Sequence, residues 1–291
     1  MKFYRLALRS LFCIPFFMST LFLNAQETPH LRIGGYVGVL QQHDLRELDA
    51  TISFAQTIEA MLKDSEVGAD VLISDTFEQA RKQFLAGKLD AMFCNTLDLP
   101  SIVELINRDA IYTMSRSGEV TLSYVMLTNN MSGRNKSLRQ LNNKQLTIGV
   151  GPNLAAHILD AEVNASPQKN GNIRFKSVHR VRNSETAIVD LMFGKTDAAL
   201  VPRIAFELAM DANPQTKRLL HTVFESAPMV PGILVMHKDV QADLLAKMHE
   251  KFIHMDTYLP GQKVLSLFHA DKMLRISPSM LGGFEKTIAS R

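Results

Sequence analysis

The sequence predicts an α/β protein of two similar lobes, each a mostly parallel sheet flanked by helices, joined by two crossover strands. Three observations support this. The phrase Gly-Lys-x-Asp-Ala occurs twice, at 87–91 and 194–198. Each copy follows a pattern of apolar residues at helical spacing and precedes a short apolar run. An earlier phrase, Leu-x-Ile-Gly, is also doubled, at 31–34 and 146–149.

The longer segments that carry the first phrase, 76–93 and 183–200, predict the same three steps. Thr76 and Asn183 can cap the start of a helix. The glycine of each copy suits the left-handed conformation that commonly ends a helix. The Asp-Ala pair then leads into a short buried strand. Each copy is therefore expected to be a helix, a glycine stop and a strand.

Each half contains two further strands and one further helix, which come before the repeated segment. The strands are expected at 31–38, 69–74, 146–153 and 173–178, and the helices at 45–63 and 154–163. Two β-α-β-α-β units result. Alternation of strand and helix is typical of a parallel sheet with helices on its faces, so each unit predicts one lobe.

The remaining segments are expected to connect the lobes and to complete the first one. Extended apolar runs at 123–130 and 232–238 predict two strands that pass between the lobes. Lobe 1 then comprises 27–125 plus 233–291, and lobe 2 comprises 130–230. Helices are expected in the tail, at 242–255, 264–270 and 279–289.

The N-terminal segment 1–25 has the pattern of a signal peptide. A basic start is followed by an apolar run at 11–23 and by Ala25, a small residue at which cleavage can occur. The run is short for a membrane span, although an uncleaved anchor is an alternative. We expect export to the periplasm, and no other stretch suggests stable insertion into a membrane.

Charge and cysteine content narrow the functional classes for the exported chain. The precursor has 32 basic and 29 acidic residues, and removal of Lys2, Arg5 and Arg9 leaves 29 of each sign. A neutral protein gives no indication of nucleic-acid binding. Cys94 is then the single cysteine, so no intrachain disulfide is expected, and we interpret it as a small buried residue rather than a nucleophile.

Four stretches of the sequence resemble one known family. They are the strand-leading phrases at 86–92 and 193–200, the segment SLRQLNNKQLTIGVGPN at 137–153, and FESAPMVPGILVMHKDV at 224–240. Their order resembles type 2 periplasmic substrate-binding proteins, and more narrowly the phosphate, phosphite and phosphonate binding proteins of ABC transporters. The resemblance implies a ligand held between two lobes.

Two departures from the family pattern bear on the ligand. Phosphonate binders of this group typically open the first helix of lobe 2 with Ser and Thr, whereas this chain has Gly-Pro-Asn-Leu-Ala-Ala at 151–156. Where the family often has an acidic residue and an aromatic after the third strand, this chain has Pro202 and Arg203. We therefore expect a small organic or inorganic anion, with Arg203 as its counter-charge.

Candidate ligand-binding residues in lobe 1 follow the predicted strands, because ligands bind beyond the carboxyl ends of parallel strands. Tyr36 can stack on a ligand and donate a hydrogen bond, or can simply lie at the lobe surface. Asn95 and Thr96 can bind a ligand or cap the next helix.

Candidates in lobe 2 occupy the corresponding positions. Asn153 and the backbone of Leu154 and Ala155 open the first helix, where free N–H groups favour anions. His179 and Arg180 follow the predicted strand at 173–178, although Arg180 can equally point to solvent.

These features favour a solute-binding protein that captures a small anion and delivers it to an ABC importer. The alternative is an exported sensing subunit that presents a bound anion to a membrane sensor kinase or receptor. No catalytic residues, metal site or cofactor are expected, because the sequence lacks nucleotide-binding and hydrolase motifs and its histidines show no metal-ligand spacing. We expect a monomer whose partners are the anion and a permease or membrane sensor.

Overall fold

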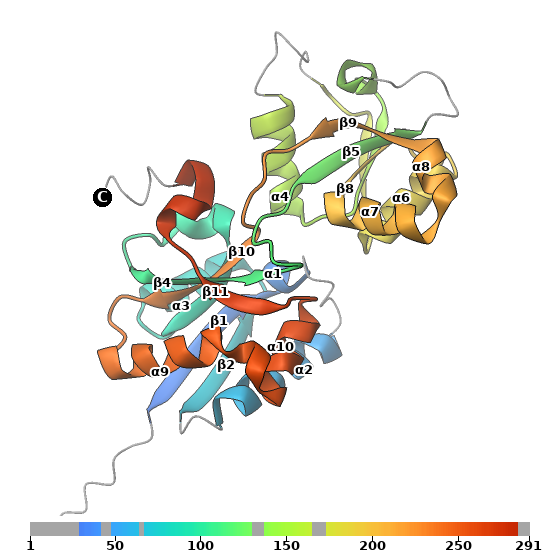
Figure 1. Cartoon of the computed structure of the whole chain (residues 1–291). Helices are drawn as coiled ribbons and strands as arrows, with labels where there is room; N and C mark the ends of the chain where they lie inside the picture. The colour runs from blue at the N-terminus through green and yellow to red at the C-terminus, as the bar shows by residue number, and fades with distance from the viewer. Residues whose placement is uncertain (1–28, 42–47, 64–66, 130–136, 165–172, 285–291) are drawn as a thin grey trace, which may run out of the picture.

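The computed structural model describes residues 29–41, 48–63, 67–129, 137–164 and 173–284. The predicted signal peptide lies outside these residues. Two separate sheets, each with its own helices, form the two lobes in Figure 1. Lobe 1 holds the strand order β11-β4-β10-β3-β1-β2, and lobe 2 holds β7-β6-β8-β5-β9. The predicted two-lobe α/β fold is confirmed.

The elements of lobe 1 come from both ends of the chain. Its strands are β1 (His30–Tyr36), β2 (Gly68–Ser74), β3 (Ala91–Asn95), β4 (Ile106–Ser115), β10 (Gly232–His237) and β11 (Lys272–Arg275). Its helices are α1 (Val37–Gln41), α2 (Leu48–Lys63), α3 (Phe77–Leu85), α9 (Ala242–Ile253) and α10 (Leu259–Leu267). Its 3-10 helices are η1 (Thr96–Ser101), η5 (Met255–Thr257) and η6 (Pro278–Phe284).

The elements of lobe 2 are continuous in the sequence. Its strands are β5 (Tyr124–Asn129), β6 (Gln145–Ile148), β7 (Ser177–Arg180), β8 (Ala198–Pro202) and β9 (Leu220–Glu225). Its helices are α4 (Pro152–His157), α6 (Ser184–Met192), α7 (Arg203–Ala212) and α8 (Pro214–Leu219). A 3-10 helix, η3 (Leu138–Leu141), precedes β6, and a π-helical turn, η4 (Ile158–Val163), continues α4.

Each sheet has a parallel half and an antiparallel half. In lobe 1, β2, β1 and β3 are parallel, whereas β10 runs antiparallel to both β3 and β4. Lobe 2 repeats this plan, with β7, β6 and β8 parallel and β5 antiparallel to β8. The strands that the chain enters from the other lobe, β10 in lobe 1 and β5 in lobe 2, each run antiparallel to their neighbours in the sheet.

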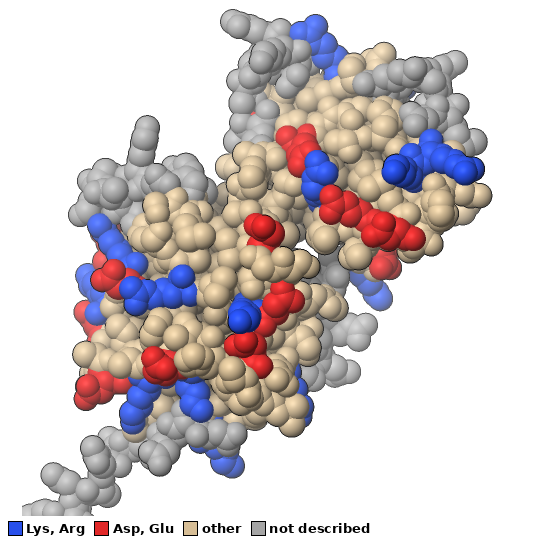
Figure 2. Space-filling model, in the orientation of Figure 1, with Lys and Arg blue, Asp and Glu red and all other residues tan. Residues whose placement is uncertain are grey.

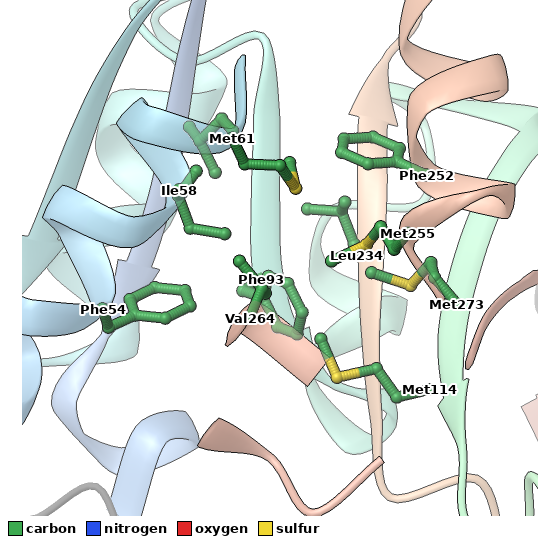
Figure 3. Close-up of a pocket in the computed structure, with 11 residues that line it drawn as sticks. Phe54, Ile58, Met61, Phe93, Met114, Leu234, Phe252, Met255, Val264 and Met273 are labelled. Atoms are coloured by element: carbon green, nitrogen blue, oxygen red, sulfur yellow. The ribbon is translucent and has the colours of Figure 1, made fainter. Parts of the chain in front are cut away.

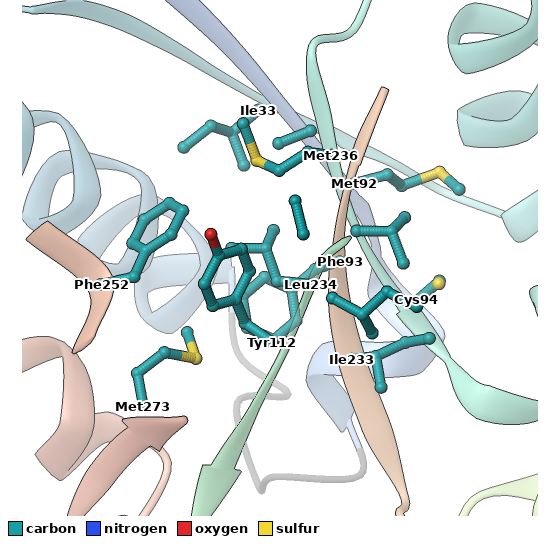
Figure 4. Packing of buried hydrophobic residues seen from close by; sticks show 14 of the residues in the cluster. Ile33, Met92, Phe93, Cys94, Tyr112, Ile233, Leu234, Met236, Phe252 and Met273 are labelled. Atoms are coloured by element: carbon teal, nitrogen blue, oxygen red, sulfur yellow. The ribbon is translucent and has the colours of Figure 1, made fainter. Parts of the chain in front are cut away.

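The central strands are buried on both faces, so each lobe has a core on either side of its sheet. In β5, Tyr124 and Met126 pack in one cluster, whereas Val125 and Leu127 pack in another. This alternation has the period of two that a strand between two layers requires. In lobe 1, Tyr112 of β4 packs against Phe252 of α9, with ring centroids 5.2 Å apart, and buried side chains of β3 and β10 belong to the same cluster (Figure 4).

The repeated segment folds as predicted in both lobes. Thr76 Oγ1 accepts a hydrogen bond from Gln79 N at 3.3 Å and caps α3. Asn183 Oδ1 accepts one from Thr186 N at 2.8 Å and caps α6. Gly87 and Gly194 lie two residues beyond the ends of these helices, with φ angles of 64° and 70°, in the left-handed region that glycine adopts without strain.

The aspartate of the repeated phrase joins its strand to the first strand of the same unit, which is its neighbour in the sheet. In lobe 1, Asp90 N donates to Arg32 O at 2.8 Å, and Asp90 Oδ2 accepts from Arg32 N at 2.8 Å. In lobe 2, Asp197 N donates to Gln145 O at 3.2 Å, and Asp197 Oδ2 accepts from Gln145 N at 2.9 Å. The phrase is repeated because each lobe secures its parallel strands in the same way.

The chain crosses between the lobes in two segments that meet each other. Leu122 N donates to Met229 O at 2.8 Å, and Met229 N donates to Leu122 O at 3.0 Å. The strands expected to pass between the lobes, β5 and β10, each hydrogen-bond within a single sheet. The crossings therefore lie earlier in the chain than expected, at 116–123 and 226–231, and we propose these segments as the lobe boundaries.

Several boundaries differ from the prediction. The expected strand at 173–178 forms only at Ser177–Arg180, because its pairing to β6 begins at Gln145 opposite Ser177. The tail contains β11, which was not predicted, and the expected helix at 279–289 is the 3-10 helix η6 as far as residue 284. Strand β4 was also not predicted, because it belongs to neither copy of the repeat.

Candidate functional site

The carboxyl ends of the parallel strands in both sheets lie at the crossings. In lobe 1, Asn95 at the end of β3 pairs with Gly232, the first residue of β10 after the second crossing. In lobe 2, Pro202 at the end of β8 pairs with Tyr124, the first residue of β5 after the first crossing. The predicted binding loops of the two lobes therefore border the same boundary (Figure 1).

Lobe 1 forms a buried polar cluster at this boundary. The Tyr36 hydroxyl donates a hydrogen bond to Asp98 Oδ2, and Asn95 Nδ2 donates to the Tyr36 oxygen. Asp98 Oδ2 also accepts from Asn95 N at 3.2 Å. The Tyr36 ring packs edge-on against Phe77, with ring centroids 5.6 Å apart. Elements that are far apart in the sequence, β1, β3 and η1, thus bring their polar side chains together.

Burial controls the ionisation of this cluster. Burial raises the pKa of Tyr36 above its ordinary value, and the charge of Asp98 acts in the same direction. Burial also raises the pKa of the Asp98 carboxyl, although hydrogen bonds from Tyr36 and Asn95 oppose that shift. Tyr36 therefore stays a neutral phenol whose hydroxyl donates a hydrogen bond to Asp98.

Two side-chain oxygens in this cluster form no well-aligned hydrogen bond within the described part of the chain, although the Asn95 side chain faces the backbone N–H of Asp98 in a capping-box arrangement. They are Asn95 Oδ1 and Thr96 Oγ1, on residues only 3% and 4% exposed. Buried polar atoms in proteins are nearly always paired, so two adjacent exceptions indicate a site rather than a core. Leu97, the next residue, packs against the lobe 2 core and so places these atoms beside the lobe boundary.

The first helix of lobe 2 presents one of its three predicted residues to solvent. Asn153 is exposed, whereas the side chains of Leu154 and Ala155 are buried in the core. Only the backbone of the latter two remains available to a ligand, and Ala155 N already donates to Gly151 O at 2.9 Å. Their role as ligand-binding residues stays a prediction.

His179 and Arg180 lie on β7, the edge strand of the lobe 2 sheet. Both are exposed, and His179 Nε2 is 3.0 Å from the Ser177 hydroxyl on the same face. Arg180 alternates with His179 and so faces the other side of the strand. Since the two side chains point in opposite directions, the structure does not bring them together. Their ligand roles also stay predictions.

Arg203 begins α7 at the lobe boundary, where its charge is already balanced. Its Nε donates to Glu225 Oε1 at 2.7 Å and its Nη1 to Glu207 Oε1 at 3.3 Å. The hydrogen bonds that Arg203 donates to these carboxylates, above all to Glu225, raise its pKa above the ordinary value. Its backbone N–H donates to Ser123 O at 2.9 Å, within the first crossing. An anion that binds Arg203 has to compete with Glu225.

The structure thus assembles Tyr36, Asn95 and Thr96 in one cluster but spreads the lobe 2 candidates over three elements. Sequence reasoning missed Asp98, which organises the lobe 1 cluster. The available signal was its spacing from Asn95, three residues further on, which is typical of side chains that bond across a helix start. Cys94 is fully buried beside the cluster as predicted, and burial raises the pKa of its thiol.

Two small cavities in the described part of the molecule lie outside this polar cluster. One, of about 10 Å³, lies in the lobe 1 core among Phe54, Met61, Met114, Phe252 and other apolar side chains (Figure 3). Its lining offers no polar group to orient a solute, so we interpret it as a packing gap. The other is of similar size and lies between Arg116 and Gly232, beside the crossings.

The described residues also give no indication of a metal or a membrane span. They contain no group of three or more His, Cys, Asp or Glu side chains placed to hold a metal ion. No helix among them has the length and apolar character needed to cross a bilayer. On the face in Figure 2, basic and acidic side chains are interspersed, in keeping with the balanced charge.

Two sheets joined by two crossings, with binding loops at their shared boundary, define a periplasmic-binding-protein fold of type 2. Solved structures agree. PhnD1 from Prochlorococcus marinus, in complex with methylphosphonate, matches with a TM-score of 0.61 at 14% identity, over 90% of this chain and 98% of that chain. A binding protein component of a Pseudomonas aeruginosa ABC phosphonate transporter also gives 0.61, at 12% identity, over 90% and 86% of the two chains.

The family model for the periplasmic substrate-binding protein of the phosphonate ABC transporter matches residues 45–281, and the chain belongs to this family. The family consists of substrate-binding transport components and not of enzymes. A third structure, a Xanthomonas citri protein bound to ATP, matches with a TM-score of 0.60 at 12% identity, over 89% and 96% of the two chains. No curated protein is similar enough to this chain to match it.

Proposed function

We propose that this protein captures a small oxyanion, phosphonate-like or otherwise, between its two lobes and delivers it to an ABC importer. The observation that supports this most is the meeting of the two sets of strand ends at one boundary, in a chain of the phosphonate-binding family. A solute at that boundary contacts both lobes only when they are close. Binding therefore favours the closed state, which is the form that a permease can recognise.

Backbone N–H groups of lobe 2 support the choice of an anion. Helix α6 begins directly after β7 with its cap at Asn183, and α4 begins after β6 at Pro152. The first turns of such helices have N–H groups without internal partners and a favourable dipole. Arg203 adds a positive charge if the ligand displaces Glu225.

The exact anion does not follow from the fold. Structures of nearly equal similarity to this one hold methylphosphonate in one case and ATP in another. The absence of the Ser and Thr residues that typically open the first helix of lobe 2 also separates this chain from typical phosphonate binders. The ligand must therefore be found by screening across anion classes.

The direct test is a thermal-shift screen of the purified protein against phosphate, phosphite, phosphonates, sulfonates and carboxylates, followed by calorimetry of the best solute. We expect at least one anion to raise the melting temperature. Arg203→Ala should weaken binding of that anion about tenfold, the usual loss for a charged hydrogen bond. Arg174→Ala, at another exposed arginine of lobe 2, is the matched control and should leave binding unchanged. If no anion shifts the melting temperature, the proposal is wrong.

Export is a separate part of the proposal. The family is periplasmic, and the N-terminal segment 1–25 has the pattern of a cleavable signal. We expect the protein in the periplasmic fraction to begin at Gln26. N-terminal mass spectrometry of that fraction measures this, and an intact Met1 in membrane-bound protein would instead support an uncleaved anchor.

A further inference from the structure

We propose that lobe 1 selects solutes that carry a hydrogen-bond donor, a hydroxyl or an ammonium group, beside their anion, through Asn95 Oδ1 with Thr96 Oγ1 next to it. Asp98 is the positioning residue that fixes this preference, acting through Tyr36. The inference rests on the proposed function, since it concerns a solute held between the lobes. It specifies which chemical group of the solute faces lobe 1.

The direction of the hydrogen bonds in the cluster determines which atom of Asn95 is left unpaired. The Tyr36 hydroxyl donates to Asp98 Oδ2, an oxygen that also accepts from Asn95 N. The Tyr36 oxygen then has no proton to offer Asn95 and must accept from the Asn95 amide nitrogen. The Asn95 carbonyl oxygen is consequently the atom left without a well-aligned hydrogen bond, although it faces the backbone N–H of Asp98. Asp98 thus fixes the orientation of the Asn95 amide through the Tyr36 hydroxyl, and so determines that the amide oxygen, not the amide nitrogen, is left available.

An unpaired amide oxygen is an acceptor with no donor capacity. It attracts an O–H or N–H group and repels the oxygens of a bare oxyanion. Thr96 Oγ1 lies on the next residue, is equally buried and can accept a second bond. The charge of Asp98 in the same cluster also disfavours a fully anionic face towards lobe 1. The lobe 1 side of the site therefore complements a donor group.

Neither oxygen is needed to stabilise lobe 1, because neither forms a bond within the described structure. Thr113, on β4 of the same sheet, provides a contrast. It is also buried, at 3% exposed, but its hydroxyl donates to Gly232 O at 2.8 Å. Removal of an unpaired buried hydroxyl should not destabilise a protein, whereas removal of a paired one should.

The first test uses this contrast. Thr96→Val should leave the melting temperature of the unliganded protein unchanged or slightly higher, while weakening the best donor-bearing solute about fivefold to tenfold. Thr113→Val, the matched control, should lower the melting temperature by a few degrees and leave affinity unchanged. If Thr96→Val destabilises the unliganded protein as much as the control does, its hydroxyl has a structural partner and the inference fails.

The second test compares solutes that share an anion and differ in the donor. The series are acetate, glycolate and glycine, and methylphosphonate, hydroxymethylphosphonate and aminomethylphosphonate. In whichever series binds, we expect a donor-bearing member to bind about tenfold more tightly than the parent. The hydroxyl and amino members show which donor is preferred. If the donor-bearing members bind no more tightly than the parent anion, this inference is wrong and the proposed function stands. If neither series binds but the wider screen finds another anion, this inference alone is again overturned.

The role of Asp98 is tested at Tyr36, the residue that connects it to Asn95. Tyr36→Phe removes the hydroxyl that hydrogen-bonds both Asp98 and the Asn95 amide, so the amide can present either its oxygen or its nitrogen to the solute. We expect the preference for donor-bearing solutes to fall from about tenfold to about twofold or less, with a smaller change in affinity for the parent anion. A uniform loss of affinity for all solutes would show a merely structural role and overturn the assignment of Asp98.

Discussion

At the scale of single residues, the aspartates of the repeated phrase have the clearest structural effect. Besides its strand-to-strand bonds, Asp90 accepts from Arg32 Nε at 2.9 Å and from Arg32 Nη2 at 2.7 Å. Burial alone raises the pKa of Asp90, but the hydrogen bonds from Arg32 outweigh it and hold the pKa below its ordinary value. Asp90 is therefore stabilised in its ionised form in the folded protein.

This shift predicts how stability depends on pH. Because the folded pKa is lower than the unfolded one, the contribution of Asp90 is fully present above its ordinary pKa of about 3.9. It is lost as the pH falls through the lower folded value. Asp90→Asn should reduce the free energy of unfolding at pH 7 by about 2 kcal/mol. Urea denaturation at pH 7 and pH 3 measures the difference, which should shrink at the lower pH. A difference that stays constant with pH would contradict the account.

The residues of the candidate site could be predicted only in part from the sequence. Tyr36 and Asn95 were placed at strand ends by the pattern, and the structure brings them into contact. Asp98 was not identified, because its partner Tyr36 is 62 positions away and pattern reasoning gives no contact at that range. The pairing of Arg203 with Glu225, 22 positions on, was missed for the same reason.

At the scale of elements, the repeated helix, glycine stop and strand could be predicted in both lobes because every signal for them is local. The cap, the helical spacing and the glycine all lie inside one short segment in each lobe, 76–93 and 183–200. The antiparallel strands β4 and β11 depend on long-range pairing, and β7 begins where its neighbour β6 allows. Sequence patterns do not carry that information.

The glycine stops give a prediction at this scale. An added Cβ at Gly87 or Gly194 meets nothing within 4 Å, so the backbone conformation alone determines the effect of substitution. Gly87→Ala should lower the free energy of unfolding by about 1 kcal/mol, because alanine is strained at positive φ. Gly87→Asn should have a smaller effect, since asparagine tolerates this region. Thermal denaturation of both variants measures this, and equal losses would exclude backbone strain as the cause.

At the scale of the whole molecule, the two crossings concentrate the connection between the lobes in a short paired segment. Pro228 and Pro231 lie on either side of Met229 and restrict the backbone of the second crossing. Leu122, in the first crossing, pairs with Met229. Ser226 Oγ accepts from Tyr124 N at 2.9 Å at the lobe 2 end of the crossings. Rotation of one rigid lobe against the other about this segment is the motion that the architecture favours.

The central claim is that a solute draws the two lobes together, and a distance measurement between them tests it most directly. Cysteines introduced at exposed Asp109 of lobe 1 and exposed Leu208 of lobe 2 can carry spin labels, because Cys94 is fully buried and should not react. We predict that the solute with the largest thermal shift moves the distribution of distances between the two spin labels to shorter values and narrows it. An unchanged distribution, in protein shown by calorimetry to be saturated with that solute, would contradict the account.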